Sequence, residues 1–158
     1  MQTKLEDEII RLLRNAEVDE IVKIGIPAIL ALITALKDKD LNVQERAAKA
    51  IGKIGVNDEQ FETIVRMLKE GETWEERYGA AIALGELKNV KTIPALITAL
   101  KDENPNVQWS AAVAIGKIAE ANPNSKEVLE AIPALITALK DEYWVVRERA
   151  AEAIGKIS

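Results

Sequence analysis

The sequence contains no cysteine and no histidine, and these two absences exclude much catalytic and metal-binding chemistry. Without cysteine there is no disulfide, no thiol nucleophile and no thiolate ligand for a metal. Without histidine the chain lacks the commonest general base and the commonest metal ligand. Ser–His and Cys–His catalytic machinery is therefore excluded. Only a carboxylate pair or a lysine is left as a source of catalysis.

Long hydrophobic runs are also missing. No uncharged run is longer than the one from Ile24 to Leu36, whereas a membrane-spanning helix needs about 20 residues. We interpret this run as a buried helix and expect no membrane partner. No basic segment followed by an apolar stretch opens the chain, so we expect no secretion signal. A cysteine-free chain suits the cytoplasm, which is where we expect the protein to lie.

Aromatic residues and positive charge are scarce as well. Aromatic side chains make up 4% of the residues, so the core has to consist of alanine, isoleucine and leucine. The net charge is −5, with both signs mixed along the chain. A nucleic-acid groove needs clustered lysine and arginine to displace counterions, so we expect no nucleic-acid partner.

What the chain does contain is one phrase repeated four times, of the form Leu-Ile-Thr-Ala-Leu-Lys-Asp. The copies lie at 32–38, 64–70 (the most divergent), 96–102 and 135–141. About sixteen or seventeen residues after its last leucine, each is followed by Ile-Gly-Lys-Ile or Leu-Gly-Glu-Leu, with the glycines at Gly52, Gly85, Gly116 and Gly155. Self-similarity at this period is typical of a solenoid, in which each unit buries its apolar face against its neighbours.

The third unit indicates two helices. Apolar residues recur at helical spacing over 93–100, with Pro94 in the first turn, where its missing N–H costs little. The turn at 102–106 is rich in asparagine, aspartate and proline, which break the chain and cap the next helix. A second helix follows, whose buried stripe is Val107, Ala111, Ala114, Ile115 and Ile118. Glycine inside that helix costs about 1 kcal/mol against alanine. Its recurrence predicts a close backbone contact, with inheritance by duplication as the alternative.

These patterns divide the chain into a single solenoid domain over 1–158. We expect a shortened capping hairpin at 1–25 and repeats at 26–56, 57–88, 89–120 and 121–158. The insertion near 121–125 makes Ser125 a candidate N-cap for a longer helix that Pro133 bends. The last unit has no capping helix after it, which favours weak end-to-end association.

The phrase Pro-Ala-Leu-Ile-x-Ala-Leu-Lys-Asp, a turn, and Val-Arg-x-x-Ala-Ala-x-Ala-Ile-Gly-x-Ile resembles the HEAT-like repeat of the phycobilisome-lyase type. The best match is 133–157, and the chain is also similar to artificial consensus proteins built from that repeat. The resemblance implies an all-α, right-handed solenoid of about five helical hairpins. Members are mostly protein-binding scaffolds, and some carry enzymes. The hydroxylases of similar architecture rely on histidine, which this chain lacks.

The resemblance also implies a polar ladder between repeats, formed by an acid after the first helix and an arginine early in the second. The acids are Asp38, Glu70, Asp102 and Asp141. Arg77 and Arg147 match the arginine position. Gln44 and Gln108 depart from it, so we expect the ladder to be weaker there.

The outward face of the second helix is charged in the outer repeats and apolar in the two central ones. Tyr78, Ile82, Trp109 and Val113 should form a contiguous patch, which Glu86 and Lys117 flank. Trp74 and Trp144 should lie at its rim. An aromatic cluster with a polar rim is typical of a binding hot spot. The alternatives are packing within the chain, with Trp109 covering Tyr78, and self-association through the patch.

The paired carboxylates offer no better site. Glu75-Glu76, Asp102-Glu103 and Asp141-Glu142 lie at turns and helix starts, where negative charge favours the helix N-terminus. No segment carries the spacing of a calcium loop. We therefore expect no catalytic residue, metal or cofactor. The sequence favours a non-catalytic scaffold that binds a protein or peptide on the concave face of the second helices. A structural or engineered repeat protein without a partner and a lyase-type subunit are the alternatives.

Overall fold

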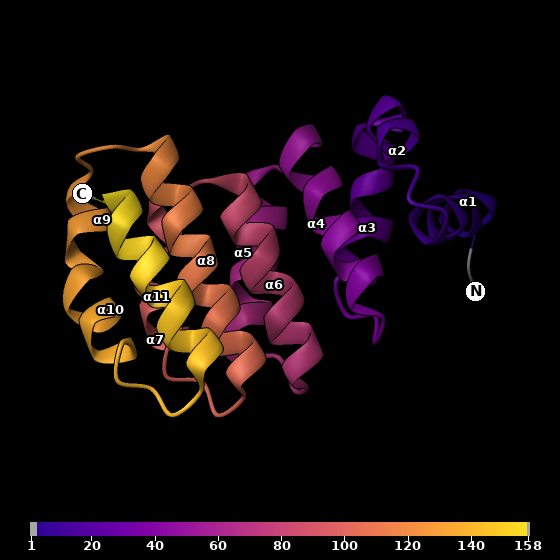
Figure 1. The fold of residues 1–158 in the computed structure, drawn as a ribbon. Helices are drawn as coiled ribbons and strands as arrows, with labels where there is room; N and C mark the ends of the chain where they lie inside the picture. Colours follow the sequence, from indigo (N-terminus) through magenta and orange to yellow (C-terminus); the bar gives the residue numbers. More distant parts are fainter. Residues whose placement is uncertain (1–2, 158) are drawn as a thin grey trace.

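Helices account for all the regular structure that the computed structural model describes, which covers residues 3–157. Those residues form eleven α-helices and two short 3-10 turns, and no strand occurs among them. Consecutive helices pair as hairpins that stack in one direction, from α1 at one end to α9, α10 and α11 at the other (Figure 1). The predicted all-α solenoid is confirmed. No helix within residues 3–157 is both long enough and apolar enough to cross a lipid bilayer.

Each hairpin has a first helix on one side of the stack and a second helix on the other. The first helices are α1 (Lys4–Arg14), α3 (Ile29–Ala35), α5 (Asp58–Glu70), α7 (Ile93–Ala99) and the consecutive pair α9 (Lys126–Glu130) and α10 (Ile132–Ala138). The second helices are α2 (Val18–Ile24), α4 (Leu41–Ile54), α6 (Trp74–Leu87), α8 (Pro105–Ala121) and α11 (Trp144–Ile157). The 3-10 turns η1 (Ile26–Ala28) and η2 (Val90–Thr92) lead into α3 and α7.

Local sequence explains where these helices begin. Asn57 accepts a hydrogen bond from the Gln60 N–H while the Gln60 side chain accepts one from the Asn57 N–H, a capping box at the start of α5. Thr73 and Asn104 cap α6 and α8 with their side-chain oxygens. The predicted cap in the turn at 102–106 is confirmed at Asn104.

The core is one continuous apolar layer rather than a central globule. It extends from Ile9 in α1 to Ala153 in α11 and consists mainly of alanine, isoleucine and leucine. The second helices α4, α6, α8 and α11 contact one another in chain order, and each contacts the first helix of its own hairpin. A row of parallel second helices is therefore fixed in place by neighbour-to-neighbour packing.

Glycine lets these second helices approach closely. A Cβ on Gly85 would lie 2.9 Å from the Ala114 Cα in the next helix, and a Cβ on Gly52 would lie 2.7 Å from the Glu86 Cβ. The predicted close backbone contact is confirmed at both positions. At Gly155 it is wrong, because a Cβ there would meet no atom within 4 Å. Gly155 belongs to the last helix, and no further helix packs on its outer side within residues 3–157.

A polar ladder links successive hairpins, as the resemblance implied. Arg77 donates to Asp102 of the next hairpin at 2.8 Å, and both side chains are only 13% exposed. Gln108 donates to Asp141 at 3.0 Å. Gln44 is buried and donates to the Leu36 and Glu75 carbonyl oxygens. Glutamine thus keeps the link but replaces an ion pair with uncharged-donor hydrogen bonds.

The joint before the last hairpin differs from its prediction. Ser125 occupies the N-cap position of α9, but its hydroxyl donates to Glu127 at 2.7 Å instead of accepting from the backbone. The single bent helix expected here is two helices, α9 and α10, separated by Ala131. Pro133 lies in the first turn of α10, where a backbone N–H would have no partner within the helix, so the missing N–H of proline costs little.

Candidate protein-binding surface

Two positions recur in each of the four long second helices, and their side chains determine the character of this side of the molecule. One turn into each helix lie Glu45, Tyr78, Trp109 and Glu148 in turn. One turn further lie Lys49, Ile82, Val113 and Glu152. The two outer helices, α4 and α11, therefore carry charge at these positions, whereas the central helices α6 and α8 carry aromatic and aliphatic side chains.

Three aromatic rings pack together where α6 meets α8. The Trp74 and Tyr78 ring centroids lie 6.2 Å apart at an interplanar angle of 73°. The Tyr78 and Trp109 centroids lie 5.6 Å apart at 67°. Both are edge-to-face contacts, which the charge distribution of aromatic rings favours. Tyr78 is the middle ring and joins the two tryptophans into one cluster.

Tyr78 is itself fully buried. Its hydroxyl donates to the Glu45 carboxylate across to α4, at 3.1 Å, which satisfies the one polar atom of the ring. Burial raises the pKa of the Tyr78 hydroxyl far above its usual value, and the neighbouring charge of Glu45 and the hydrogen bond raise it further. The phenol is therefore neutral at physiological pH and acts as a structural anchor between α4 and α6.

The remaining predicted patch residues of α6 and α8 lie at the surface. Trp74, Ile82, Trp109 and Val113 are each half-buried, so each presents part of its side chain to solvent. Trp74, Ile82 and Trp109 also pack on the core. We call all four residues the central surface. The expectation for Tyr78 needs correction: its ring supports the central surface from beneath and reaches no solvent, because the two tryptophans cover it.

Polar groups at the rim of the central surface are already paired. Lys117 forms an ion pair with Glu86 at 2.5 Å, which joins α8 to α6. The Trp109 indole N–H donates to the Asn106 side chain at 3.1 Å. These contacts hold the rim in place, so little side-chain freedom is left to lose when a ligand binds.

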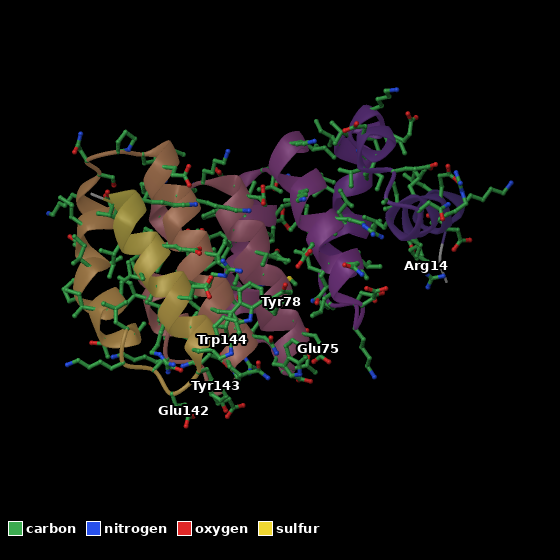
Figure 2. The ribbon with its side chains drawn as sticks, viewed as in Figure 1. Arg14, Glu75, Tyr78, Glu142, Tyr143 and Trp144 are labelled. Carbon is green, nitrogen blue, oxygen red and sulfur yellow. The ribbon has the colours of Figure 1, made fainter. Side chains whose placement is uncertain are left out.

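Trp144 lies apart from this cluster. It opens α11 and is 67% exposed, and the neighbouring Tyr143 is 43% exposed. In Figure 2 both lie with Glu142 at the lower end of α11, at the same end of the row as Glu75. Tyr143 was not identified as a candidate from the sequence. The available signal was an aromatic residue at the position where the earlier turns have Thr73 and Asn104. The ring contacts between residues 3 and 157 join Trp74, Tyr78 and Trp109 and do not reach Trp144.

Other hollows lie away from the central surface. One of about 570 Å³ is lined by residues of α5, α6 and α7, among them Leu68, Arg77 and Ile97. Another of about 330 Å³ lies between α1, α3 and α4 and includes Leu30 and Val43. Within residues 3–157 no three histidine, cysteine, aspartate or glutamate side chains are grouped so as to hold a metal ion.

Comparison with known proteins places this architecture in a family. The sequence model for HEAT repeats matches residues 61–155, which is more than half of the chain. This chain belongs to the HEAT-repeat family. The resemblance inferred from the repeated phrase is thus confirmed. No curated protein sequence matches this HEAT-repeat protein.

Solved structures share its fold. A chain of the CpcE–CpcF complex of phycocyanin lyase from Nostoc sp. has a TM-score of 0.69 and 17% sequence identity, covering 84% of this protein and 79% of that chain. A designed armadillo repeat protein has a TM-score of 0.57 and 23% identity, with coverages of 91% and 69%. At these identities the likeness shows the fold alone. Human deoxyhypusine hydroxylase is 28% identical with a TM-score of 0.58, and the match covers 82% of this protein but only 43% of the hydroxylase.

Proposed function

We propose that this HEAT-repeat protein is a non-catalytic scaffold whose central surface binds a protein segment or peptide. One observation carries the proposal: where the outer second helices carry charge, the central helices α6 and α8 present the half-buried apolar side chains of Ile82, Trp109 and Val113. Aromatic anchors surrounded by paired polar groups are the usual composition of a binding hot spot. Trp74 and Trp109 are the anchors, and the buried Tyr78 fixes their orientation.

The mechanism would be preorganisation. Packing of α6 against α4 and α8 sets the spacing of the central surface before any ligand arrives. The Lys117–Glu86 ion pair already orders the rim. A peptide laid across α6 and α8 would therefore bury apolar area without first ordering the scaffold, which lowers the entropic cost of association. Designed armadillo proteins for modular peptide recognition share this fold, at a TM-score of 0.51 and 22% identity. That likeness concerns the fold alone and does not identify a ligand for this protein.

The test uses substitutions that the row itself already tolerates. Ile82→Lys copies Lys49 of α4, and Val113→Glu copies Glu152 of α11, so both changes place a charge where neighbouring repeats carry one. We expect peptides selected from a displayed library against the 158-residue protein to bind each variant at least about tenfold more weakly, a loss of about 1.4 kcal/mol. Thermal midpoints should stay within a few degrees of the wild type. Trp109 is a poorer probe, since its ring also covers Tyr78.

Lys49→Ala is the matched control, because it changes the same helical position outside the central surface. It should leave peptide affinity unchanged. Selected peptides that bind both charged variants as tightly as the wild type would place binding elsewhere and contradict the proposal. A library that yields no peptide above background would favour the second candidate, a structural or engineered repeat protein without a partner. The near-identity of the repeated phrase at 32–38, 96–102 and 135–141 is the observation behind that candidate.

A further inference from the structure

The last hairpin exposes apolar side chains whose counterparts in the earlier full repeats are buried or half-buried. Leu139 of the final repeat is 37% exposed. The leucines at the same place in the preceding repeats are exposed by 4% or less: Leu36, Leu68 and Leu100. Ile136 is 49% exposed, whereas its counterpart Ile33 is 8% exposed and the counterparts Val65 and Ile97 are half-buried. The outer side of α10 is therefore built like a contact between repeats but has no repeat packed on it within residues 3–157.

The outer side of α11 shows the same difference. Ala151 is exposed, whereas its counterparts in α4, α6 and α8 are exposed by 1% or less: Ala48, Ala81 and Ala112. A Cβ on Gly155 would meet nothing within 4 Å, whereas the same atom on Gly85 would touch the next helix at 2.9 Å. Small residues that admit a neighbouring helix elsewhere in the stack are thus open to solvent here.

The polar ladder is also open at this end. Arg77 and Gln108 each donate to an aspartate of the following hairpin. Arg147, the equivalent residue of α11, donates only to the Asp141 and Glu142 carbonyl oxygens of its own turn, at 2.7 and 3.2 Å. It pairs with no carboxylate within residues 3–157. We call Ile136, Leu139, Arg147, Ala151 and Gly155 the C-terminal face.

The opposite end of the stack does not complement this face. Apart from Leu5, the exposed side chains of α1 and α2 are charged, and one ion pair forms within each of these helices. Arg11 forms an ion pair with Glu8 at 2.6 Å, and Lys23 forms one with Glu20 at 3.0 Å. Covering the C-terminal face with the first hairpin of another copy would strip water from these charges without new partners for them. A head-to-tail stack is therefore disfavoured.

We propose that the C-terminal face binds the same face of a second copy of this chain, around a two-fold axis beside Ala151. Arg147, Ala151 and Gly155 follow one another at four-residue intervals and so share one side of α11. When two such helices pair antiparallel about Ala151, Arg147 of each copy lies beside Gly155 of the other copy. The cation then approaches the C-terminal carbonyl groups of the other helix, where positive charge is favoured. Ile136 and Leu139 would be covered on both sides of the axis.

The contact is isologous and closes at two copies. A second α11 takes the place of the next helix in the row, but it runs antiparallel, whereas α4, α6, α8 and α11 run parallel to one another. The contact also leaves the central surface free, because that surface lies on α6 and α8.

Sedimentation of the 158-residue protein over a concentration series tests the association. The wild type should change from monomer to dimer as concentration rises and should form nothing larger. Leu139→Glu should remain monomeric. Leu30→Glu is the matched control, because Leu30 is an equally apolar residue, 72% exposed, in the first full repeat; it should dimerise as the wild type does. Ile82→Lys should also dimerise normally. A monomer at every concentration, or loss of the dimer in Ile82→Lys, would overturn the proposal.

A single cysteine tests the axis. The chain has no cysteine, so Ala151→Cys introduces the only thiol. Beside a two-fold axis its two copies come within the roughly 4.4–6.8 Å between Cα atoms that a disulfide requires. Mild oxidation should convert most of the Ala151→Cys protein to a covalent dimer, while Leu30→Cys reports the background of random collision. Equal cross-linking of the two variants, or oligomers larger than a dimer in the wild type, would overturn the two-fold arrangement.

Discussion

Tyr78 illustrates how one residue determines what its neighbours can do. Its ring lies between Trp74 and Trp109, and its hydroxyl is bound by Glu45 of the preceding second helix. Helical spacing predicted that Tyr78 points away from the hairpin core, which is correct for an isolated repeat. Its burial depends on how closely α6 lies between α4 and α8, and one repeat's sequence does not specify that distance. The sequence therefore identified the aromatic cluster but left open whether Tyr78 is exposed or is covered by Trp109.

The buried phenol makes stability depend on pH in the alkaline range. Unfolded tyrosine ionises near pH 10, whereas burial and Glu45 raise the pKa of folded Tyr78. The contribution of Tyr78 is fully present below about pH 10 and is lost as the pH rises, because only the unfolded state releases the proton. Between the two pKa values the free energy of unfolding should fall by about 1.4 kcal/mol per pH unit from this group.

Urea unfolding of Tyr78→Phe and wild type between pH 8 and about pH 11 measures this contribution. We expect the variant to be about 1 kcal/mol less stable at pH 8, through loss of the Glu45 hydrogen bond. The difference should shrink or reverse above about pH 10. Tyr143→Phe, at a phenol that is 43% exposed, is the control and should follow the wild-type curve. Parallel pH curves for Tyr78→Phe and wild type would contradict the assignment.

At the scale of the helix, apolar spacing and turn-forming residues predicted most elements. The exceptions are explained by side-chain contacts that spacing does not reveal. Four-residue apolar periodicity located α4, α6, α8 and α11, and the turn residues located their starts. Ser125 was expected to cap a long helix, yet its hydroxyl donates to Glu127. An N-cap preference is a local propensity, and a nearby carboxylate is a competing acceptor that spacing alone does not weigh.

The recurring glycine of the second helices allows the effect of helix propensity on stability to be measured apart from the effect of interhelix packing. Gly85→Ala should destabilise the protein by about 1–3 kcal/mol, since its Cβ would collide with the Ala114 backbone of the next helix. Gly155→Ala should instead stabilise it by about 0.5 kcal/mol, because alanine favours helix and its Cβ meets open space. Urea midpoints measured at a concentration where the protein is monomeric compare the two. Equal effects at both positions would show that the glycine serves no interhelix contact.

At the scale of the whole molecule, self-similarity predicted the architecture, because a repeated amphipathic hairpin can bury its core only against its neighbours. Self-similarity does not predict where one repeat differs from the others. Gln108 was expected to weaken the ladder, and its amide still reaches Asp141, with an uncharged donor in place of the guanidinium that Arg77 offers Asp102. Ile82, Trp109 and Val113 of the central surface follow from substitutions at two positions in two repeats, whereas Trp74 lies at the start of α6. The C-terminal face is harder to see, because Leu139, Ala151 and Gly155 match their counterparts and differ only in lacking a neighbour.

Hydrogen exchange of the free protein, followed segment by segment under native conditions, tests most directly whether each hairpin is held only by its neighbours. At a concentration where the protein is monomeric, the account predicts the highest opening free energies in α6 and α8, which have packed neighbours on both sides. Protection should decrease stepwise toward α1 and toward α11. The same opening free energy in every helix from α1 to α11 would indicate a single cooperative core and contradict the account.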